Sequence, residues 1–153
     1  MAGHYAGTPE EIRALDAYTK LQRAAESVLV RTTQHLSKRG LTTSQFAVLE
    51  ALHHLGTLSQ RELAHKLLKS TGNISIVLKN LEERGLIDRT RDPDDHRYKQ
   101  VCITAAGDDL LLSFFDDHVR GIVQDLSVLT PAEQEELARL CRKLGLQEGA
   151  SAT

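Results

Sequence analysis

Cysteine is scarce in this sequence, and long apolar runs are missing. Only two of the 153 residues are cysteines, Cys102 and Cys141. They are too few and too far apart for a disulfide framework or a CxxC motif, so we expect two reduced, buried thiols. No apolar run approaches the roughly 18 residues that a membrane-spanning helix requires, so we predict no membrane partner.

Targeting signals and repeats are missing as well. The opening residues, "MAGHYAGTPEEIRALD", contain no basic region followed by a long apolar one. We therefore expect a cytoplasmic protein rather than a secreted one. Hydrophobic residues make up 41% of the chain and charged residues 26%, which is typical of a globular protein with one domain, or a small domain plus appended elements.

No motif for catalysis, cofactor binding or metal binding is recognisable. An enzyme would need a nucleophile with a base, paired carboxylates in a cleft or a glycine-rich phosphate loop. The Asp-Asp pairs that begin at positions 94, 108 and 116 instead suit solvated faces and helix starts. No two histidines lie four residues apart on one predicted helix. The histidines considered as metal ligands are His53, His54, His65, His96 and His118. We therefore predict neither an enzyme nor a metal or cofactor site.

Positive charge gathers in the middle of the chain. The net charge is −2, which argues against a uniformly basic nucleic-acid-binding protein. Residues 59–99 nevertheless carry 9 Lys and Arg against 7 Asp and Glu, whereas residues 100–153 carry 4 against 9. This surplus of positive charge indicates where a polyanionic partner would bind.

Apolar spacing and capping residues predict three helices in the first part of the chain. The first is long, covers residues 10–39 and ends at Gly40, because glycine readily adopts a left-handed conformation. The second begins after Thr42, with a glutamine three residues later as in a capping box, and ends at Gly56. Ser59 caps the third, with a glutamate three residues later in the same role.

A fourth helix is predicted from about Thr71 to Arg84, at the polar stretch "STGN". At 100° per residue, one stripe of this helix is apolar and the opposite side is small or polar. The apolar stripe consists of Ile74, Val77, Leu78 and Leu81. The opposite side consists of Gly72, Ser75, Ile76 and Lys79, with Asn73 and Asn80 at its margin. Two helices joined by about four residues with a glycine describe a helix-turn-helix, with the fourth helix as the reading helix.

Two short segments rich in β-forming residues follow Gly85. "LIDRTR" and "RYKQVCIT" are separated by "DPDDH", whose proline and aspartates indicate a hairpin turn. A helix-turn-helix followed by a basic two-stranded hairpin is a winged helix. The predicted fold class is therefore mainly α with a small β-wing, as a winged helix-turn-helix DNA-binding domain over residues 42–104.

The remaining helices are too apolar to be covered by that domain alone. Thr104 is predicted to cap a long helix, and Thr130 with Pro131 begins the last one. Apolar residues spread widely around the long helix, and such a surface calls for a second partner. We therefore predict that residues 1–41 and 105–153 form dimerisation helices that join two winged helices into a homodimer.

Short side chains at the start of the reading helix would let its backbone approach the base edges in a major groove. Ser70 or Thr71 can cap the helix while its free N–H groups face a phosphate. Asn73 can pair with adenine, Ser75 with several bases, and Lys79 with guanine or a phosphate. Taken alone, these residues also fit an ordinary cap and a solvated charge. The adjacent basic hairpin favours DNA.

Basic residues surround the acidic turn of the hairpin. Arg97 at the wing tip can enter a minor groove, whose negative potential attracts it, and Asp95 is close enough to brace its guanidinium. The alternative is a solvated, self-neutralised turn, because three aspartates cancel much of the charge. The other basic residues of the hairpin are Arg89, Arg91 and Lys99.

Residues 67–107, "LLKSTGNISIVLKNLEERGLIDRTRDPDDHRYKQVCITAAG", resemble the MarR family of bacterial transcriptional regulators. The matching features are "GN(I/V)(S/T)" at the start of the reading helix, "LExxGLI" at its end, and the wing signature D-x-R-x-x-x-V-x-(L/I)-T-x-x-G. The wing signature is formed here by Asp95, Arg97, Val101, Ile103, Thr104 and Gly107. The order of the helices extends the resemblance over nearly the whole chain.

The resemblance implies a homodimer that binds a pseudo-palindromic operator in double-stranded DNA. Such regulators are usually repressors, and a small aromatic or phenolic ligand in a cleft between the two modules often releases them. The residues facing the major groove would be Thr71, Gly72, Asn73, Ser75 and Lys79. Arg97 would enter the minor groove, and Ser59 and Gln60 would contact phosphates.

Two other functions stay open from the sequence. A winged helix can bind protein through its wing and outer helix, and such binding would lack the steep salt dependence of phosphate contacts. A redox-responsive regulator could use Cys102 or Cys141. The resemblance does not favour the peroxide-sensing subclass, which uses a reactive cysteine near the N-terminus, because no cysteine precedes Cys102 here.

Overall fold

The computed structural model describes residues 5–91, 93–95 and 99–149. The chain falls into two compact units. We call Thr33–His118 the winged-helix unit, and Met1–Thr32 together with Val119–Thr153 the terminal unit. Within the described residues, no helix combines the length and the apolar composition needed to cross a membrane.

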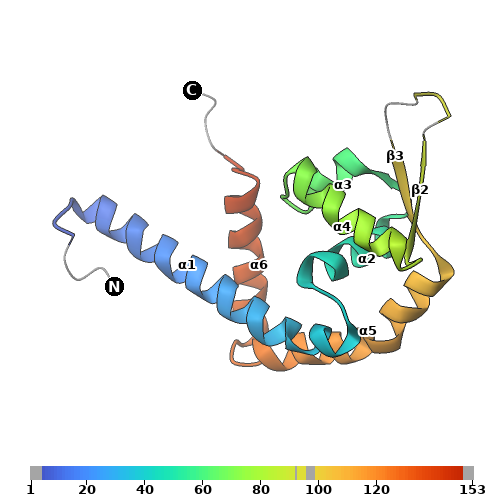
Figure 1. The fold of residues 1–153 in the computed structure, drawn as a ribbon. Helices are drawn as coiled ribbons and strands as arrows, with labels where there is room; N and C mark the ends of the chain where they lie inside the picture. The colour runs from blue at the N-terminus through green and yellow to red at the C-terminus, as the bar shows by residue number, and fades with distance from the viewer. Residues whose placement is uncertain (1–4, 92, 96–98, 150–153) are drawn as a thin grey trace. The chain divides into compact units, whose positions relative to one another are not determined.

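The winged-helix unit combines short helices with a small antiparallel sheet (Figure 1). Its elements in chain order are the 3₁₀ helix η1 (Gln34–Arg39), α2 (Thr43–Leu55), β1 (Leu58–Ser59), α3 (Gln60–Lys66), α4 (Thr71–Glu83), β2 (Ile87–Arg91), β3 (Lys99–Ile103) and the first part of α5 (Ala105–Leu126). This order confirms the predicted fold class, mainly α with a small β-wing.

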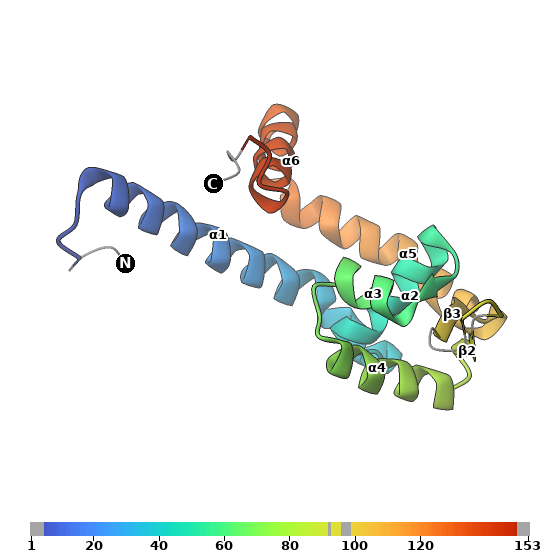
Figure 2. The same cartoon turned by 90° about the horizontal axis from the view of Figure 1, so that it is seen from above.

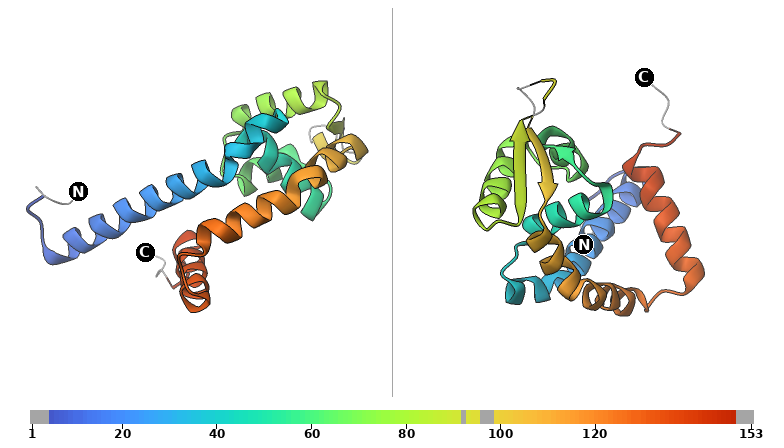
Figure 3. Two further views of the ribbon diagram at one scale, coloured as in Figure 1. Left: turned by 90° about the horizontal axis from the view of Figure 1, so that it is seen from below. Right: turned by 90° about the vertical axis from the view of Figure 1, so that its right-hand side faces the viewer.

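The sheet contains one strand more than the sequence predicts. β2 and β3 pair antiparallel, with Ile87 opposite Ile103, which confirms the hairpin (Figure 3). β1 pairs with the other edge of β3, with Leu58 opposite Val101, and the strand order is β1-β3-β2. A strand of two residues leaves no alternation to detect in a sequence. The prediction of two strands was therefore incomplete.

Local hydrogen bonds begin the helices where the sequence predicts. The side chains of Thr42 and Ser59 each accept a hydrogen bond, at 3.1 Å, from the backbone N–H three residues later. Both capping boxes are complete. Thr104 Oγ1 accepts from Gly107 N at 3.1 Å, at the start of α5. These caps satisfy N–H groups that have no partner inside the helix.

The first helix differs from the prediction in its last turns. α1 covers Pro9–Thr33, and the run continues as the 3₁₀ helix η1 until Gly40 ends it with a φ of 67°. Thr32 Oγ1 donates to the Val28 carbonyl at 2.8 Å, a bond of the kind that bends helices. Because 3₁₀ turns are tighter than α turns, they change the side that faces inward. Leu36 of η1 is buried, whereas no described residue of α1 is.

Apolar side chains from all parts of the winged-helix unit meet in one core. The buried set includes Leu36, Leu49, Leu58, Leu63, Ile74, Leu78, Leu81, Ile87, Val101, Leu111 and Phe114. Burying a side chain of this size contributes about 1.5–3 kcal/mol. The core holds α4 by its inner side, which leaves the outer side available for other contacts.

A second histidine satisfies the buried imidazole of His118. Its Nδ1 lies 2.9 Å from Nε2 of His35, so one of the two nitrogens carries the proton that the other accepts. Phe46 and Phe114 surround the pair, with ring centroids 4.6 Å from His118 and 5.6 Å from His35, respectively. The pair connects η1 to α5 inside the winged-helix unit.

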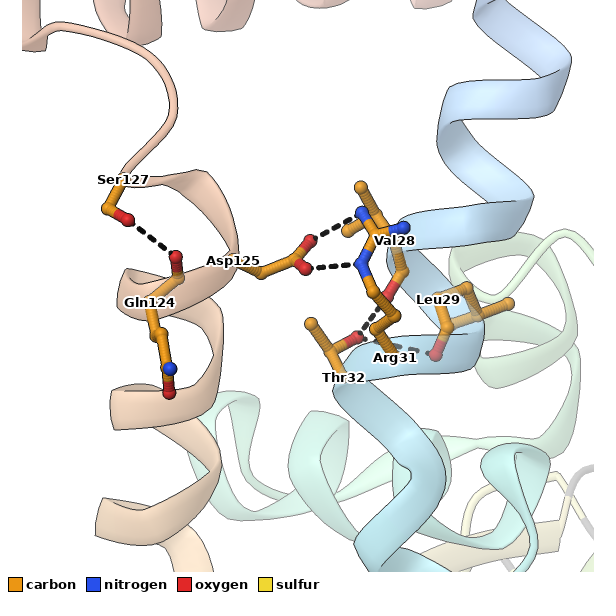
Figure 4. A network of polar contacts seen from close by, with 7 residues as sticks. All are labelled: Val28, Leu29, Arg31, Thr32, Gln124, Asp125 and Ser127. Atoms are coloured by element: carbon orange, nitrogen blue, oxygen red, sulfur yellow. Dashed lines mark hydrogen bonds and ion pairs between the residues drawn. The ribbon is translucent and has the colours of Figure 1, made fainter.

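The terminal unit consists of α1, the end of α5 and α6 (Pro131–Gly145). Thr130 accepts a hydrogen bond, at 3.3 Å, from the backbone N–H three residues later, which confirms the predicted start of α6. Arg31 and Asp125 join α1 to α5 in a two-pronged ion pair, with Nη2 of the arginine 3.0 Å from Oδ2 (Figure 4). The hydrogen bond from Arg31 lowers the pKa of Asp125 below its ordinary value.

Apolar side chains stay exposed on the helices of the terminal unit. No described residue of α6 is buried. The exposed apolar residues are Ile12, Leu15, Leu21, Leu29 and Val30 of α1, Val119 and Val123 of α5, and Leu137, Leu140 and Leu144 of α6. Cys141 is exposed among them, and Cys102 in β3 is half-buried. The expectation of two buried thiols is therefore wrong within a single chain, because nothing described in the chain covers this side of α6.

Candidate nucleic-acid interface

α4 has one apolar and one polar side, as its 100° spacing predicts. Ile74, Leu78 and Leu81 are at most 1% exposed. The exposed residues on the other side are Gly72, Asn73, Ser75, Ile76, Lys79 and Asn80. Figure 2 shows α4 at the periphery of the winged-helix unit. An outer side of small and polar residues is what an approach to base edges requires.

Ser70 is the N-cap of α4. Its Oγ accepts a hydrogen bond from Asn73 N at 3.2 Å, which decides between the two candidates that the sequence leaves open. Thr71 is the first residue of the helix, and its side chain is outside the described part of the structure. The cap uses the backbone N–H of Asn73, while the Asn73 side chain is exposed on the outer side of the helix.

The turn before α4 does not use glycine. Leu67 to Ser70 join α3 to α4, and the residue with positive φ is Leu68, at 52°. The glycine expected in the turn, Gly72, lies inside the first turn of α4. Leu68 is 91% exposed, so its strained backbone is not explained by burial of the side chain.

Ser59 and Gln60 lie where β1 meets α3, and both are half-buried. Ser59 Oγ accepts from Glu62 N at 3.1 Å, and Ser59 N donates to Glu62 Oε2 at 2.7 Å. This backbone hydrogen bond lowers the pKa of Glu62. The hydroxyl proton of Ser59 can still be donated to an anion, because the cap uses only the oxygen as an acceptor.

The wing brings two cations opposite each other. Arg91 in β2 faces Lys99 in β3 across the ladder, and both are exposed. Arg97 lies outside the described residues, so its predicted place in a minor groove stays a prediction. The bracing of Arg97 by Asp95 likewise stays a prediction.

Arg89 does not join the cations at the wing tip, although the sequence suggests it. Its guanidinium binds Glu82 of α4, with Nε and Nη2 at 2.8 and 2.5 Å from Oε2. The two side chains are 16% and 39% exposed. The ion pair is internal to the unit and connects the wing to the reading helix.

Two residues near α4 were not among the predicted contacts. Ile76 is 64% exposed on the outer side, and Lys69 lines a shallow groove beside it. The groove is lined by Ser44, Lys69, Asn73, Ile76 and Val77. The 100° spacing places Ile76 on the outer side, but an isoleucine is not a hydrogen-bonding group, so a search for donors and acceptors overlooks it. Among the described residues, Lys79 forms a long ion pair with Glu83, at 3.9 Å.

Three of the candidate metal-binding histidines, His53, His54 and His118, contact other side chains. His53 Nδ1 lies 2.8 Å from Asp108 Oδ1, and the ring of His54 lies 5.6 Å from that of Phe115. His96 is outside the described residues. Among the residues that the structure covers, no group of three or more His, Cys, Asp and Glu side chains is arranged to hold a metal ion.

The sequence and the fold are both similar to known regulators. A sequence model of the MarR family matches residues 39–97. The HTH-type transcriptional regulator MhqR of Bacillus subtilis is 34% identical over 134 residues, which are 88% of this chain and 92% of MhqR. This similarity confirms the resemblance seen in residues 67–107.

Two solved structures share the fold. The first is the structure of Bordetella bronchiseptica BpsR, whose DNA binding is regulated by 6-hydroxynicotinic acid. It matches with a TM-score of 0.77 and 27% sequence identity, and the match covers 85% of this chain and 98% of BpsR. The other, S. aureus MepR in complex with DNA, has a TM-score of 0.74 and 27% identity, over 84% of this chain and 96% of MepR. With this winged-helix architecture and similarity to MhqR over most of both chains, the protein belongs to the MarR family of transcriptional regulators.

Proposed function

We propose that the protein binds a pseudo-palindromic operator in double-stranded DNA as a homodimer and represses transcription until a small molecule releases it. The observation that carries the proposal is the outer side of α4. That side is exposed over its first two turns and, apart from Ile76, carries small or polar residues, while the core holds the other side of the helix. A helix anchored in this way can enter a major groove without unfolding any part of the unit.

The reading contacts come from the first turns of α4. Thr71 and Gly72 lie at the helix start, where free N–H groups and the helix dipole favour an anion such as a phosphate. Asn73 and Ser75 offer hydrogen bonds to base edges, and Lys79 offers a cation to guanine or to a phosphate. We assign this DNA-binding role to residues 42–104.

Contacts to the DNA backbone and the minor groove complete the interface. Ser59 and Gln60 at the start of α3 are assigned to phosphates, which position the protein without reading sequence. Arg97 is assigned to the minor groove, where the negative potential is strongest over A·T-rich DNA. Direct and backbone contacts together determine both where the dimer binds and how salt weakens it.

We assign dimerisation to residues 1–41 and 105–153. The exposed apolar residues of α1, α5 and α6 support this, since extended exposed apolar surfaces mark interaction sites and no described residue of α1 or α6 is buried. A two-fold dimer also presents two reading helices to the two half-sites of a palindrome. The regulator is placed in the cytoplasm and has no enzymatic role in this proposal.

Release by a small molecule is proposed from two considerations. The resemblance to the MarR family implies an inducible repressor, and BpsR is a related protein whose DNA binding is regulated by 6-hydroxynicotinic acid. We therefore propose that a small aromatic or phenolic compound lowers the affinity for the operator. By linkage, the operator must lower the affinity for that compound by the same factor.

Fluorescence anisotropy with DNA from upstream of the gene tests the proposal. If about six phosphates are contacted, affinity falls about a thousandfold between 50 and 200 mM salt. Lys79→Ala should weaken binding and reduce that slope, and Arg97→Ala should weaken binding by about 1–3 kcal/mol. A protein that stays monomeric and ignores duplex DNA at low salt overturns the proposal, and tight protein binding without a salt slope would favour the interaction-module alternative.

A further inference from the structure

We infer that Ile76 reads thymine, by contact of its side chain with the C5-methyl group of one thymine in each operator half-site. The inference rests on the proposed function, because it requires α4 to lie in a major groove. Among the described side chains of α4, Ile76 is the only large apolar one that is exposed, at 64%. The other assigned major-groove residues with described side chains, Asn73, Ser75 and Lys79, offer hydrogen bonds or a positive charge to the groove rather than an apolar surface.

Packing within the subunit does not account for an isoleucine at this position. Ile76 lies opposite the buried stripe of α4, so it gains little from burial. A β-branched residue is also mildly unfavourable in a helix. Packing does not account for the glycine at position 72, one turn before Ile76, because a Cβ at that position would meet no atom within 4 Å. A glycine and an exposed isoleucine on one side of a helix point to a partner outside the subunit.

The neighbours of Ile76 indicate what that partner is. Residues three and four positions apart are neighbours on a helix surface, so Ile76 lies between Asn73 and Lys79. A protein partner that captures an apolar anchor usually surrounds it with further apolar contacts, whereas the neighbours here are polar and cationic. The major groove offers this mixture: donors and acceptors on base edges, phosphates, and the single methyl group of thymine.

The groove beside Ile76 supports the same partner. Ser44 of α2 and Lys69 of the turn lie along it together with Asn73, Ile76 and Val77. A hydroxyl and an ammonium group suit a phosphate, and the two aliphatic side chains suit a methyl group. The C5-methyl of thymine stands at the outer edge of the major groove, near the backbone of its own strand. One DNA strand can therefore supply both the phosphate and the methyl group.

Deoxyuridine tests this contact, because uracil keeps the base pairing and the O4 acceptor of thymine and lacks only the methyl group. Each thymine of one half-site of the operator is replaced in turn, and affinity is measured at constant salt. For the unmodified protein, we expect a loss of about three- to fivefold at one position, the amount expected for one buried methyl group. Ile76→Ala should bind the unmodified operator less tightly and show no further loss at that position.

Leu68→Ala is the matched control, because Leu68 is also an exposed aliphatic residue close to α4. It should keep the full sensitivity to uracil. Equal sensitivity of Ile76→Ala and the unmodified protein at every thymine would overturn the inference, as would an unmodified protein insensitive to uracil. A protein that binds no duplex DNA at all would overturn the proposed function instead, so the two failures are distinct. Thermal unfolding shows that each variant is folded.

Discussion

The guanidinium of Arg89 in β2 holds the carboxylate of Glu82 in α4 through two N–H groups, at 2.8 and 2.5 Å from the same oxygen. The pair joins the wing to the reading helix within the winged-helix unit. Charge-assisted hydrogen bonds of this kind are stronger than neutral ones, and partial burial limits their screening. The ion pair therefore links the two proposed DNA-contacting elements directly.

Arg89→Ala should lower the free energy of unfolding by about 1–2 kcal/mol, because Glu82 loses a partly buried partner. Arg89→Lys should restore only part of it, since an ammonium group cannot reproduce the planar guanidinium. Urea unfolding followed by circular dichroism measures the change. Arg91→Ala, one pleat further along β2 and exposed, is the control. Equal stabilities for the Arg89→Ala and Arg91→Ala variants would show that the ion pair does not stabilise the unit.

Gly72→Ala should separate stability from DNA binding. Alanine is the better helix former, and its Cβ would meet no atom of the subunit within 4 Å, so stability should rise by a few tenths to about 1 kcal/mol. In the proposed complex the added methyl group faces the DNA, and affinity should fall. Thermal unfolding and operator titration of the same preparation measure both changes. A variant that is more stable and binds as tightly would exclude a close approach at this position.

Asn73→Ala should relax discrimination between operators. The side chain is exposed, and an asparagine can bond adenine N6 and N7 together, a contact that contributes about 1–3 kcal/mol of discrimination. The loss should be confined to operators that carry the correct base pair at one position. Competition binding between single-base operator variants checks this. A uniform loss over all sequences would mean that Asn73 positions the helix without reading a base.

Gly107→Ala should destabilise the winged-helix unit by about 3 kcal/mol. A Cβ at this position would lie 2.2 Å from the Leu86 carbonyl oxygen and 2.8 Å from Cγ1 of Ile103, and a backbone atom cannot rotate away. Gly121→Ala, on the same helix, adds its methyl group to open space in the subunit and is the control. Chemical denaturation compares the two. A Gly107→Ala protein as stable as the control would mean that α5 can shift at low cost.

The ion pair between Arg31 and Asp125 should make the terminal unit sensitive to acid. The hydrogen bond from Arg31 lowers the folded-state pKa of Asp125 below 3.8. An aspartate whose pKa is lower in the folded state than in the unfolded state stabilises the fold at pH values above its unfolded-state pKa. This stabilisation is lost as the pH falls through the folded-state pKa. Asp125→Asn should therefore lose less thermal stability than the unmodified protein below about pH 4. Asp109→Asn, an exposed aspartate on the same helix, should keep the full acid dependence. Parallel pH profiles for both variants would contradict the pair's role.

Several features of this fold were predictable because they depend on neighbours in the sequence. The caps at Thr42, Ser59 and Thr130 each involve a residue three positions later. Such a pattern can be recognised in a stretch of four residues of the sequence. The two sides of α4 follow from a period of 3.6 residues in the same way. The wing strands were recognisable from β-forming residues around a proline-containing turn.

Other features depend on contacts between distant positions. The pairing of Leu58 with Val101 adds a third strand, and the hydrogen bond between His35 and His118 spans 83 positions. The sequence predicts that Arg89 is one of the exposed cations of the wing, whereas the fold places Glu82 beside it as an ion-pair partner. The periodicity of a single segment cannot predict such partners, because they depend on how distant segments pack together.

By itself, the sequence determined the order of the helices, the caps at Thr42, Ser59 and Thr130, the inner stripe of α4 and the family to which the chain belongs. Each of these depends on the order and spacing of neighbouring residues. Only the tertiary structure decided that Arg89 is bound to the reading helix, that Gly107 permits the approach of the Leu86 carbonyl, and that Leu58 pairs with Val101. Those properties arise when side chains far apart in the chain compete for the same space and the same hydrogen bonds, and folding resolves that competition.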